Sequence, residues 1–343
     1  MEKLILSIII PTFNSENYIA RTIKSLFDMI GKYTNCVEVI FIDDGSSDGT
    51  LSVLKRLQKE HHFLRIISNS HQGVSIARNS GIEIASGKYI TFLDSDDTFE
   101  TKFIENFKKL VSAYDEPDLI FVDVEKIDRP KLIDNLNDDE RLVAMQSTLN
   151  LGKIKTKQGI ASKFFKRSFV LDEKLFYDSR IVISEDALFN INCISRANSI
   201  LFAPDLFYHV EESHTLKYYS SKNLSGQLAF LNELKKILLK YGNNKKALEI
   251  LNQSKLKAVN LIVDRYYGPL YINGTYNLRE SASLLKKVIK SNDLSVAFKT
   301  NEFDEILSLR YRIFRRLLKY QQYSLCFLCD KLFDRIKGYN RFK

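Results

Sequence analysis

The stretch that decides the fold is VEVIFIDDGSSDGT, residues 37–50. Its first six residues are apolar apart from Glu38, and an acidic turn containing two glycines follows at Asp43. A short apolar run of this kind predicts a strand that is buried on both faces, as in a parallel sheet. Glycine allows the backbone to turn sharply there. We therefore expect a buried strand whose carboxyl end carries acidic and polar groups.

The same alternation of apolar runs and amphipathic segments extends to both sides of this stretch. The expected strands are Leu4–Ile10, Val37–Ile42, Leu64–Ile67, Tyr89–Leu93 and Leu119–Val122. The expected helices are Asn17–Ile30, Asp48–Glu60, Val74–Ala85 and Thr98–Ala113. Strands that alternate with helices predict an α/β fold with a doubly wound, mainly parallel sheet.

The remainder of the chain differs in pattern. Residues 128–159 are polar and weakly patterned, with some helix expected, and residues 160–210 are strongly patterned again. Beyond about residue 220 the sequence is rich in Leu, Ile and Lys and reads as helical. We expect two domains, an α/β domain over residues 1–215 and a C-terminal α-helical addition over residues 216–343, because 343 residues exceed what one core usually supports.

The composition, with 45% hydrophobic and 27% charged residues, is that of an ordinary globular protein. No stretch approaches the roughly 18 apolar residues of a membrane span. The run Leu4–Ile10 leads into Pro11 without a small-residue cleavage site, so it predicts a first strand and not a signal peptide. Four cysteines are too few for a disulfide framework and favour a reducing cytoplasm. The pair Cys326 and Cys329 lacks the partners of a zinc site.

The net charge of +9 is concentrated at the C-terminus, where residues 310–343 carry +8. A nucleic-acid-binding protein more often carries its basic stripe on the folded domain, so we expect no nucleic-acid partner. Apolar residues recur at helical spacing in this segment, with Arg and Lys between them. Two interpretations stay open: a helix that lies on anionic lipid at the inner face of the cell membrane, or a helix packed on the body with a solvated basic face. Homo-oligomerisation also stays open.

Ligands of doubly wound sheets bind beyond the carboxyl ends of the strands. The residues at these ends are Pro11–Asn14, Asp43–Ser47 and Asp94–Asp97. The first strand is not followed by G-x-G-x-x-G, and the chain contains no G-x-x-x-x-G-K-[ST]. Dinucleotide-binding and P-loop sites are therefore excluded.

Asp94-Ser95-Asp96 follows a predicted buried strand. Two carboxylates at this spacing suit Mg²⁺ or Mn²⁺, which bind through one or two carboxylates and keep positions for substrate phosphates. The alternative is that Asp96 or Asp97 caps a helix beginning near Thr98. Capping accounts for one aspartate but not for three acids in four residues.

A carboxylate at Asp43 or Asp44 can accept hydrogen bonds from a base or a ribose hydroxyl. The alternative is a plain turn in which Asp48 caps the following helix.

Four motifs together give a specific resemblance. They are Ile8-Ile9-Ile10-Pro11-Thr12-Phe13-Asn14, Ile42-Asp43-Asp44-Gly45-Ser46-Ser47-Asp48-Gly49-Thr50, Gln72-Gly73-Val74-Ser75-Ile76-Ala77-Arg78-Asn79-Ser80-Gly81 and Phe92-Leu93-Asp94-Ser95-Asp96-Asp97. In this order they resemble glycosyltransferase family 2, and Ser184-Glu185-Asp186-Ala187-Leu188-Phe189 resembles that family's ED motif. The resemblance implies a GT-A fold, a divalent metal and inverting transfer.

The resemblance also implies roles for individual residues. The nucleotide-binding residues would be Pro11, Thr12, Phe13, Asn14, Asp43, Asp44, Gly73, Arg78, Asp94 and Ser95. The metal would be bound by Asp96 and Asp94, with His209 a further candidate ligand and His214 a weaker one. Asp186 would be the general base, with Glu185 the second choice. The alternative is that these two acids only complement a helix dipole.

The expected function is transfer of a hexose or N-acetylhexosamine from a UDP-sugar to an acceptor hydroxyl with inversion. The expected product is a bacterial cell-surface polysaccharide, teichoic acid or surface glycoprotein glycan. A catalytically silent relative that serves as scaffold or chaperone for an active partner is the alternative, but Asp94, Asp96 and Asp186 argue against it. A nucleotidyltransferase would need a glycine-rich basic loop after the first strand, where Pro11 and Thr12 stand instead.

Overall fold

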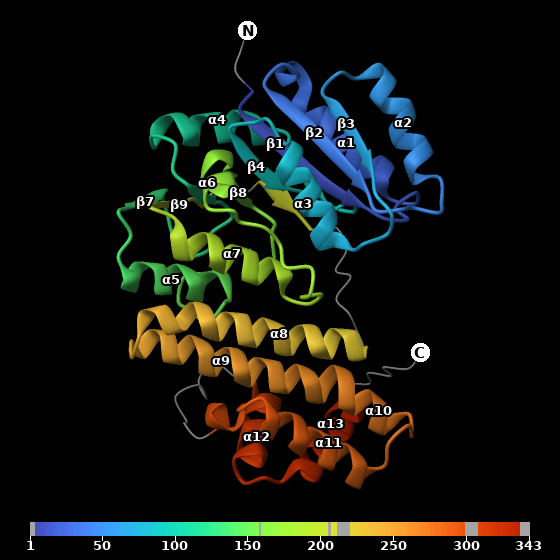
Figure 1. Cartoon of the computed structure of the whole chain (residues 1–343), viewed down its shortest axis with the longest axis vertical. Helices are drawn as coiled ribbons and strands as arrows, with labels where there is room; N and C mark the ends of the chain where they lie inside the picture. The colour runs from blue at the N-terminus through green and yellow to red at the C-terminus, as the bar shows by residue number, and fades with distance from the viewer. Residues whose placement is uncertain (1–3, 158, 205–206, 211–219, 299–307, 337–343) are drawn as a thin grey trace. The chain divides into compact units, whose positions relative to one another are not determined.

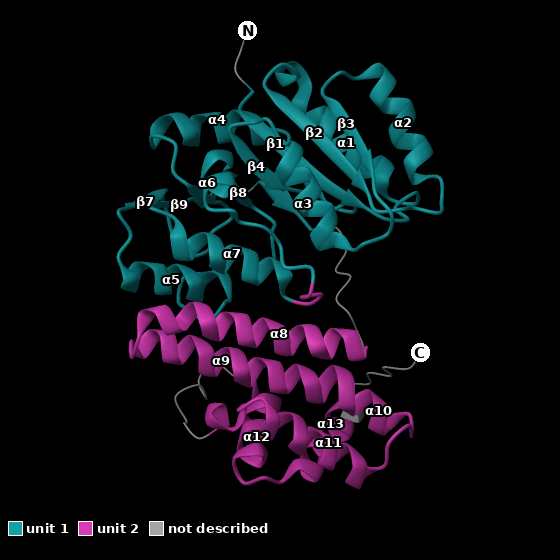
Figure 2. Cartoon of the chain, in the orientation of Figure 1, with its two compact units in different colours: residues 1–179, 184–213 teal, residues 180–183, 214–343 magenta. Residues whose placement is uncertain are grey.

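The computed structural model describes residues 4–157, 159–204, 207–210, 220–298 and 308–336. The chain forms two compact units, shown in different colours in Figure 2. The first comprises residues 1–179 and 184–213, and the second comprises residues 180–183 and 214–343.

The first unit is built on an eight-stranded sheet with the order β3-β2-β1-β4-β8-β6-β9-β7 (Figure 1). Its strands are β1 (Leu6–Thr12), β2 (Val37–Asp43), β3 (Leu64–Ser68), β4 (Tyr89–Phe92), β6 (Leu119–Phe121), β7 (Lys131–Asp134), β8 (Lys163–Lys166) and β9 (Ser199–Phe202). Strands β1 to β4 pair in parallel, as do β6 and β9, whereas β8 and β7 run antiparallel to their neighbours. The predicted α/β fold with a mainly parallel sheet is confirmed.

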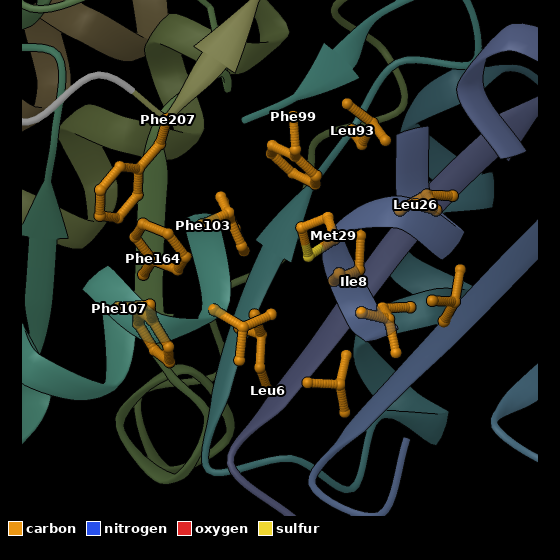
Figure 3. Packing of buried hydrophobic residues seen from close by; sticks show 14 of the residues in the cluster. Leu6, Ile8, Leu26, Met29, Leu93, Phe99, Phe103, Phe107, Phe164 and Phe207 are labelled. Atoms are coloured by element: carbon orange, nitrogen blue, oxygen red, sulfur yellow. The ribbon is translucent and has the colours of Figure 1, made fainter. Parts of the chain in front are cut away.

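Helices cover both faces of this sheet, as the alternation of strand side chains requires. The helices α1 (Ile19–Ile30), α2 (Thr50–Glu60) and α4 (Phe103–Ala113) contribute side chains to one large apolar cluster with Ile8 of β1 (Figure 3). The helix α3 (Val74–Ile84) packs on the other face, where Gly81 lies so close to Ile9 that a Cβ atom would clash at 2.4 Å. Residue 81 therefore has to be glycine for α3 to sit this close to β1.

On the α3 face, Phe92 of β4 contacts the ring of Phe165 in β8 and the ring of Phe189 in α7 (Glu185–Arg196). The ring of Phe189 also stacks on Tyr177, with ring centroids 4.3 Å apart. This aromatic packing fixes the position of α7, whose first turn carries the two acids of the ED motif.

The segment Thr98–Ala113 differs from its prediction as one helix. Thr98–Phe99 forms the short strand β5, which pairs antiparallel with β10 (Tyr208–His209), and helix α4 begins only at Phe103. Neither Asp96 nor Asp97 therefore caps this helix. The pairing of β5 with a strand more than 100 residues later has no local sequence signal.

The weakly patterned region contains β7 and the helix α5 (Asp138–Thr148), which begins with a capping box between Asn137 and Glu140. The short helix α6 (Arg167–Asp172) follows β8. A 3₁₀ turn, η1 (Gly31–Tyr33), closes α1.

The second unit is helical in the residues that the structure describes. It contains α8 (Ser221–Leu238), η2 (Leu239–Tyr241), α9 (Lys245–Ile262), the π-helical turn η3 (Val263–Tyr267), α10 (Gly268–Ile272), α11 (Leu278–Ser291), η4 (Ser295–Phe298), α12 (Leu309–Lys319) and α13 (Tyr323–Ile336). Within the described residues, none of the helices has the length and apolar character that a bilayer crossing requires.

Candidate active site

The three predicted strand ends meet at one edge of the sheet, because β1 lies between β2 and β4 and pairs in parallel with both. Backbone hydrogen bonds join β1 to β2, with Asp44 N 2.8 Å from Thr12 O. The Asn14 side chain accepts from Ser47 N at 2.8 Å, and Ser15 Oγ lies 3.0 Å from Ser95 Oγ. Pro11 is half-buried and Thr12 is buried in the same rim.

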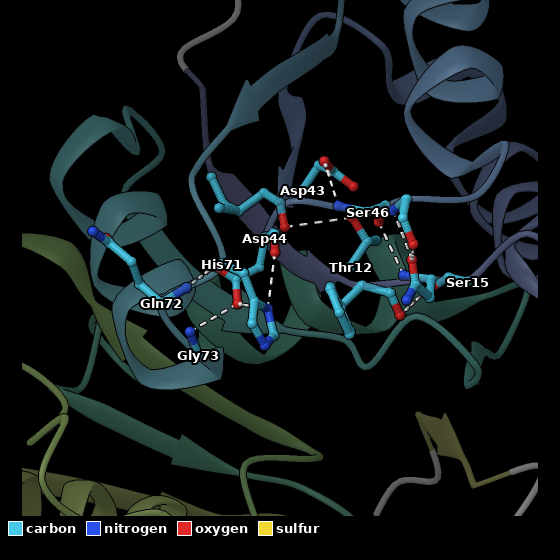
Figure 4. Close-up of polar contacts among 12 residues, drawn as sticks. Thr12, Ser15, Asp43, Asp44, Ser46, His71, Gln72 and Gly73 are labelled. Atoms are coloured by element: carbon cyan, nitrogen blue, oxygen red, sulfur yellow. Dashed lines mark hydrogen bonds and ion pairs between the residues drawn. The ribbon is translucent and has the colours of Figure 1, made fainter.

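Asp43 and Asp44 are both buried, at 0% and 4% exposure. Asp44 accepts hydrogen bonds from the backbone N–H groups of Gln72 and Gly73, at 2.9 and 2.8 Å (Figure 4). Gly73 has φ of 97°, which favours glycine, and it is the N-cap residue of α3. In this structure Asp44 thus holds the loop before α3. Asp43 Oδ2 accepts from Ser46 N, while its buried Oδ1 has no hydrogen-bond partner among the described residues.

An aromatic pair is exposed beside these buried acids. The rings of Phe13 and His71 stack with centroids 4.2 Å apart and an interplanar angle of 24°. Phe13 is 41% exposed, and the His71 side chain is 62% exposed with Nδ1 3.3 Å from Asp44 Oδ2. An exposed ring at a strand end offers a flat apolar face to a base.

Arg78 of α3 is the centre of a buried charge cluster. Its Nη1 atom donates to Asp186 Oδ1 at 2.6 Å and to Glu185 Oε1 at 3.2 Å. Its Nη2 atom donates to Asp94 Oδ1 at 3.1 Å. The guanidinium thus joins the acidic turn after β4 to the first turn of α7. Its packing over the Tyr177 ring, 5.3 Å from the centroid, restricts its orientation.

The Asp186 carboxyl has a strongly shifted pKa. Burial raises its pKa from 3.8 to about 7, Arg78 opposes the rise, and the nearby Glu185 and Asp94 reinforce it. Both Glu185 and Asp186 lie in the first turn of α7, so they also complement its dipole. That alternative does not account for their shared contact with Arg78.

The Asp94–Asp97 turn is fixed by a residue that the sequence did not indicate. Tyr208, fully buried, donates its hydroxyl hydrogen to Asp97 Oδ2 at 2.6 Å and accepts from Asp94 N at 3.3 Å. The backbone of the turn is held further, with Arg21 donating to Asp96 O at 2.7 Å. Asp94 keeps 45% of its side chain exposed, and Asp96 is half-buried.

His209 contacts Glu100 and not the aspartates predicted to bind the metal. Its Nε2 atom lies 2.6 Å from Glu100 Oε1, and its side chain points away from the face used by Tyr208, as successive strand residues do. The structure therefore does not bring His209 to Asp94, and its metal-binding role stays a prediction. His214 lies outside the described residues. Among the residues described, no three His, Cys, Asp or Glu side chains are grouped as a metal site.

A buried lysine lies beside the general-base candidate. Lys163 Nζ donates to the carbonyls of Lys157, Gly159 and Ala161 at 2.7, 3.0 and 3.1 Å. Burial lowers the pKa of Lys163 to about 7, while Asp186 and Asp123 favour its charged form. A Cβ atom at Gly159 would lie 3.3 Å from Asp186 Oδ2, so the loop held by Lys163 adjoins the carboxylate. The sequence gave no indication that Lys163 holds this loop beside Asp186.

Comparisons with known proteins agree with this fold. Residues 7–176 match the family described as Glycosyl transferase family 2. The chain is 28% identical over 240 residues to the putative glycosyltransferase EpsH of Bacillus subtilis (strain 168), covering 67% of each protein. It is 28% identical over 210 residues to the poly(ribitol-phosphate) beta-glucosyltransferase of Bacillus spizizenii, but that match covers 60% of the chain and only 32% of the relative.

Among solved structures, S. aureus TarS 1–349 in complex with UDP-GlcNAc is similar, with a TM-score of 0.61 and 17% identity. The likeness covers 97% of this chain and 92% of that one. At such identity it shows the fold, which is GT-A. Together with the family match over residues 7–176, this fold defines the class, that of the GT-A glycosyltransferases. Within it, residues 7–176 of the chain belong to Glycosyl transferase family 2.

Proposed function

We propose that this protein is an inverting glycosyltransferase that moves a hexose or N-acetylhexosamine from a UDP-sugar to an acceptor hydroxyl. One observation carries the proposal: the Arg78 guanidinium contacts Asp94 and Asp186 together. Asp94 belongs to the turn expected beside the donor diphosphate, and Asp186 is the acid expected beside the acceptor. Inverting displacement needs the group that binds the leaving diphosphate and the base that activates the acceptor on opposite sides of one anomeric carbon. The residues with these two roles therefore have to lie close together.

In the proposed reaction Asp186 takes the proton of the acceptor hydroxyl while that oxygen bonds to the anomeric carbon. The bond from this carbon to the diphosphate oxygen breaks, and its electron pair leaves with UDP. A carboxylate whose pKa lies near 7 is matched to proton transfer at neutral pH. Arg78 favours the ionised carboxylate and fixes its direction. Glu185, on the same guanidinium, stays the second choice for the base.

The nucleotide would bind at the rim formed by Pro11–Asn14 and the turn after β2. Phe13 is the exposed ring there, so we propose that the base stacks on it. Asp43 and Asp44 would act mainly by shaping the loop, with the buried Oδ1 atom of Asp43 as an available acceptor. TarS structures with UDP-GlcNAc and with UDP support a uridine donor by fold similarity.

A divalent cation fits the turn after β4 by the chemistry of its donors. Asp94 and Asp96 are two partly exposed carboxylates, which is the number that Mg²⁺ or Mn²⁺ takes when substrate phosphates and water complete its shell. When bound, the ion would neutralise charge on the leaving diphosphate. A mannosyltransferase of this fold, PcManGT, is recorded with GDP-Man and Mn²⁺.

The metal proposal can be tested by calorimetry with UDP. We expect tight binding in Mn²⁺ and weak binding after treatment with EDTA, and Asp96→Asn should abolish the difference. Equal affinity for UDP with and without metal would refute the metal assignment. Asp28→Asn, a substitution of an acid in α1, serves as the matched control.

We propose a cell-surface glycan as the acceptor, because a relative is a poly(ribitol-phosphate) glucosyltransferase. Residues 1–215 would form the nucleotide-sugar-binding and catalytic domain, and residues 216–343 a helical domain. The reaction would take place in the cytoplasm. A hydrolysis screen of UDP-Glc, UDP-Gal, UDP-GlcNAc and UDP-GalNAc with Mn²⁺ tests activity and donor together. The expected result is release of UDP from one of them by the wild type, and release at least about 100-fold slower by Asp186→Asn.

A further inference from the structure

The helical hairpin α12–α13 exposes a row of leucines. Leu325, Leu328 and Leu332 of α13 are 42%, 42% and 56% exposed. Their spacing of three and four residues places them on one face of the helix. Three large apolar side chains in a row on a surface helix indicate a contact site more than isolated exposed leucines do.

These leucines do not belong to the core of the hairpin. The buried apolar side chains of the described hairpin are Phe314 and Leu318 of α12 and Cys326 and Phe327 of α13. The hairpin is therefore folded by its other faces, and the leucine row is available to a partner. The apolar residues that recur at helical spacing in α12 and α13 therefore include buried side chains, such as Phe314, and the exposed leucine row.

The neighbouring helix exposes a row of cations. Arg312, Arg316 and Lys319 are exposed on α12 with the same three- and four-residue spacing. Arg315 is buried at 1% exposure and does not belong to this row. Leu309 at one end and Tyr320 at the other are 63% and 69% exposed.

The described surface of the hairpin carries more basic than acidic side chains. Between residues 308 and 333, every exposed charged side chain that the structure describes is basic, and Asp330 is buried at 0% exposure. Asp330 lies inside the unit, where it contacts Arg310. From residue 334 on, the sequence adds Asp334, Arg335, Lys337, Arg341 and Lys343, and Glu302, Asp304 and Glu305 precede the hairpin.

We propose that the exposed leucines of α13 (Leu325, Leu328 and Leu332) and the exposed cations of α12 (Arg312, Arg316 and Lys319) bind an anionic lipid bilayer. A bilayer surface takes apolar side chains at the headgroup boundary and attracts cations beside them. A symmetric contact with a second copy would instead bring two cationic rows together. The charge on this surface therefore favours lipid over self-association.

The experiment uses the full chain and vesicles of phosphatidylcholine with 30% phosphatidylglycerol, against pure phosphatidylcholine. Each basic residue near an anionic surface changes the binding constant about fivefold, so Arg312→Gln/Arg316→Gln/Lys319→Gln should lower it about 100-fold. Leu325→Gln/Leu328→Gln/Leu332→Gln should lower binding while the salt dependence remains. Matched controls are Lys235→Gln/Lys240→Gln/Lys245→Gln and Leu239→Gln/Leu248→Gln, all at exposed sites of the same unit.

The expected result is co-sedimentation with anionic vesicles that weakens as salt rises, since exposed charges are screened over about 10 Å at 0.1 M. Both hairpin variants should co-sediment more weakly than the wild type, and both controls should co-sediment like the wild type. Thermal melting monitored by circular dichroism confirms that each variant is folded. The proposal is overturned if wild type ignores anionic vesicles at low salt, or if the hairpin variants bind as well as the controls. It is also overturned if light scattering shows a dimer that the leucine variant dissociates and no vesicle binding occurs.

Discussion

Nη1 of Arg78 lies 2.6 Å from Oδ1 of Asp186, although the two residues are 108 positions apart in the chain. The same guanidinium contacts Asp94 and Glu185. A single cation therefore stands among three carboxylates in a largely buried place. Arg78 is best understood as the residue that sets the orientation and protonation of the proposed base.

The pH dependence of transfer should report this relationship. Asp186 has to be ionised to act as a base, so kcat should rise with pH through about 7. Replacing Arg78 with Gln removes the cation that favours ionisation, so the rising limb should move to higher pH. Transfer activity at pH 7 should fall at least tenfold. The measurement is the rate of UDP release at a series of pH values from 5.5 to 9.

Arg78→Lys is the informative companion variant. It keeps a positive charge but not the fork of donors that reaches Asp94 and Asp186 together. We expect the rising limb of its kcat–pH profile to stay near the wild-type pH and the maximal kcat to be lower. A pH profile that is unchanged in Arg78→Gln would show that Arg78 does not act on the base.

Phe13 offers a test of the proposed nucleotide site. Base stacking on an aromatic ring contributes about 1–3 kcal/mol, so Phe13→Ala should weaken UDP binding roughly 5- to 100-fold, while Phe13→Tyr should preserve it. Because Phe13 is 41% exposed, the alanine variant should melt close to the wild type. Calorimetry with UDP and Mn²⁺ measures the change. Affinity equal to the wild type in Phe13→Ala would place the base elsewhere.

Tyr208 should contribute to stability and to the shape of the acidic turn. Tyr208→Phe removes the donor to Asp97, a hydrogen bond to a carboxylate worth about 1.5–3 kcal/mol. The melting temperature should fall by several degrees, and Mn²⁺-dependent UDP binding should weaken. Tyr320→Phe, at a residue 69% exposed, should leave both unchanged. A variant at residue 208 with unaltered melting and binding would show that this hydroxyl is dispensable.

The sequence indicated the parallel half of the sheet and the strand ends of the site. In runs such as Val37–Asp43 all side chains but Glu38 and the terminal Asp43 are apolar, so a buried strand could be predicted from the local composition. The wrong helix start at Thr98 came from a different cause. Thr98–Phe99 is a strand only because Tyr208–His209 pairs with it, and that partner is distant in sequence. Asp48 accepts from Thr50 N, close to the capping role considered for it, although the helix begins at Thr50.

The residues of the site could be predicted from sequence motifs, but the contacts between them could not. The motifs named Arg78, Asp94 and Asp186 separately, but no spacing shows that one guanidinium reaches both acids. Lys163 lies in a stretch, Lys163-Phe164-Phe165-Lys166-Arg167, that resembles the family more loosely, but no role was predicted for it or for Tyr208, because lone buried polar residues have no periodicity. The burial of Asp44 against the backbone of residues 72 and 73 also depends on a loop 28 residues away.

The central claim is that Asp186 acts as the base of an inverting transfer. The direct measurement is a proton NMR time course of hydrolysis of an α-linked UDP-sugar with Mg²⁺, in which water replaces the acceptor. The account predicts that the β-anomer of the free sugar appears first, and that Asp186→Asn binds UDP like the wild type but releases sugar 10²- to 10⁴-fold more slowly. Glu185→Gln should retain the activity. First release of the α-anomer, or full activity in Asp186→Asn, would contradict the account.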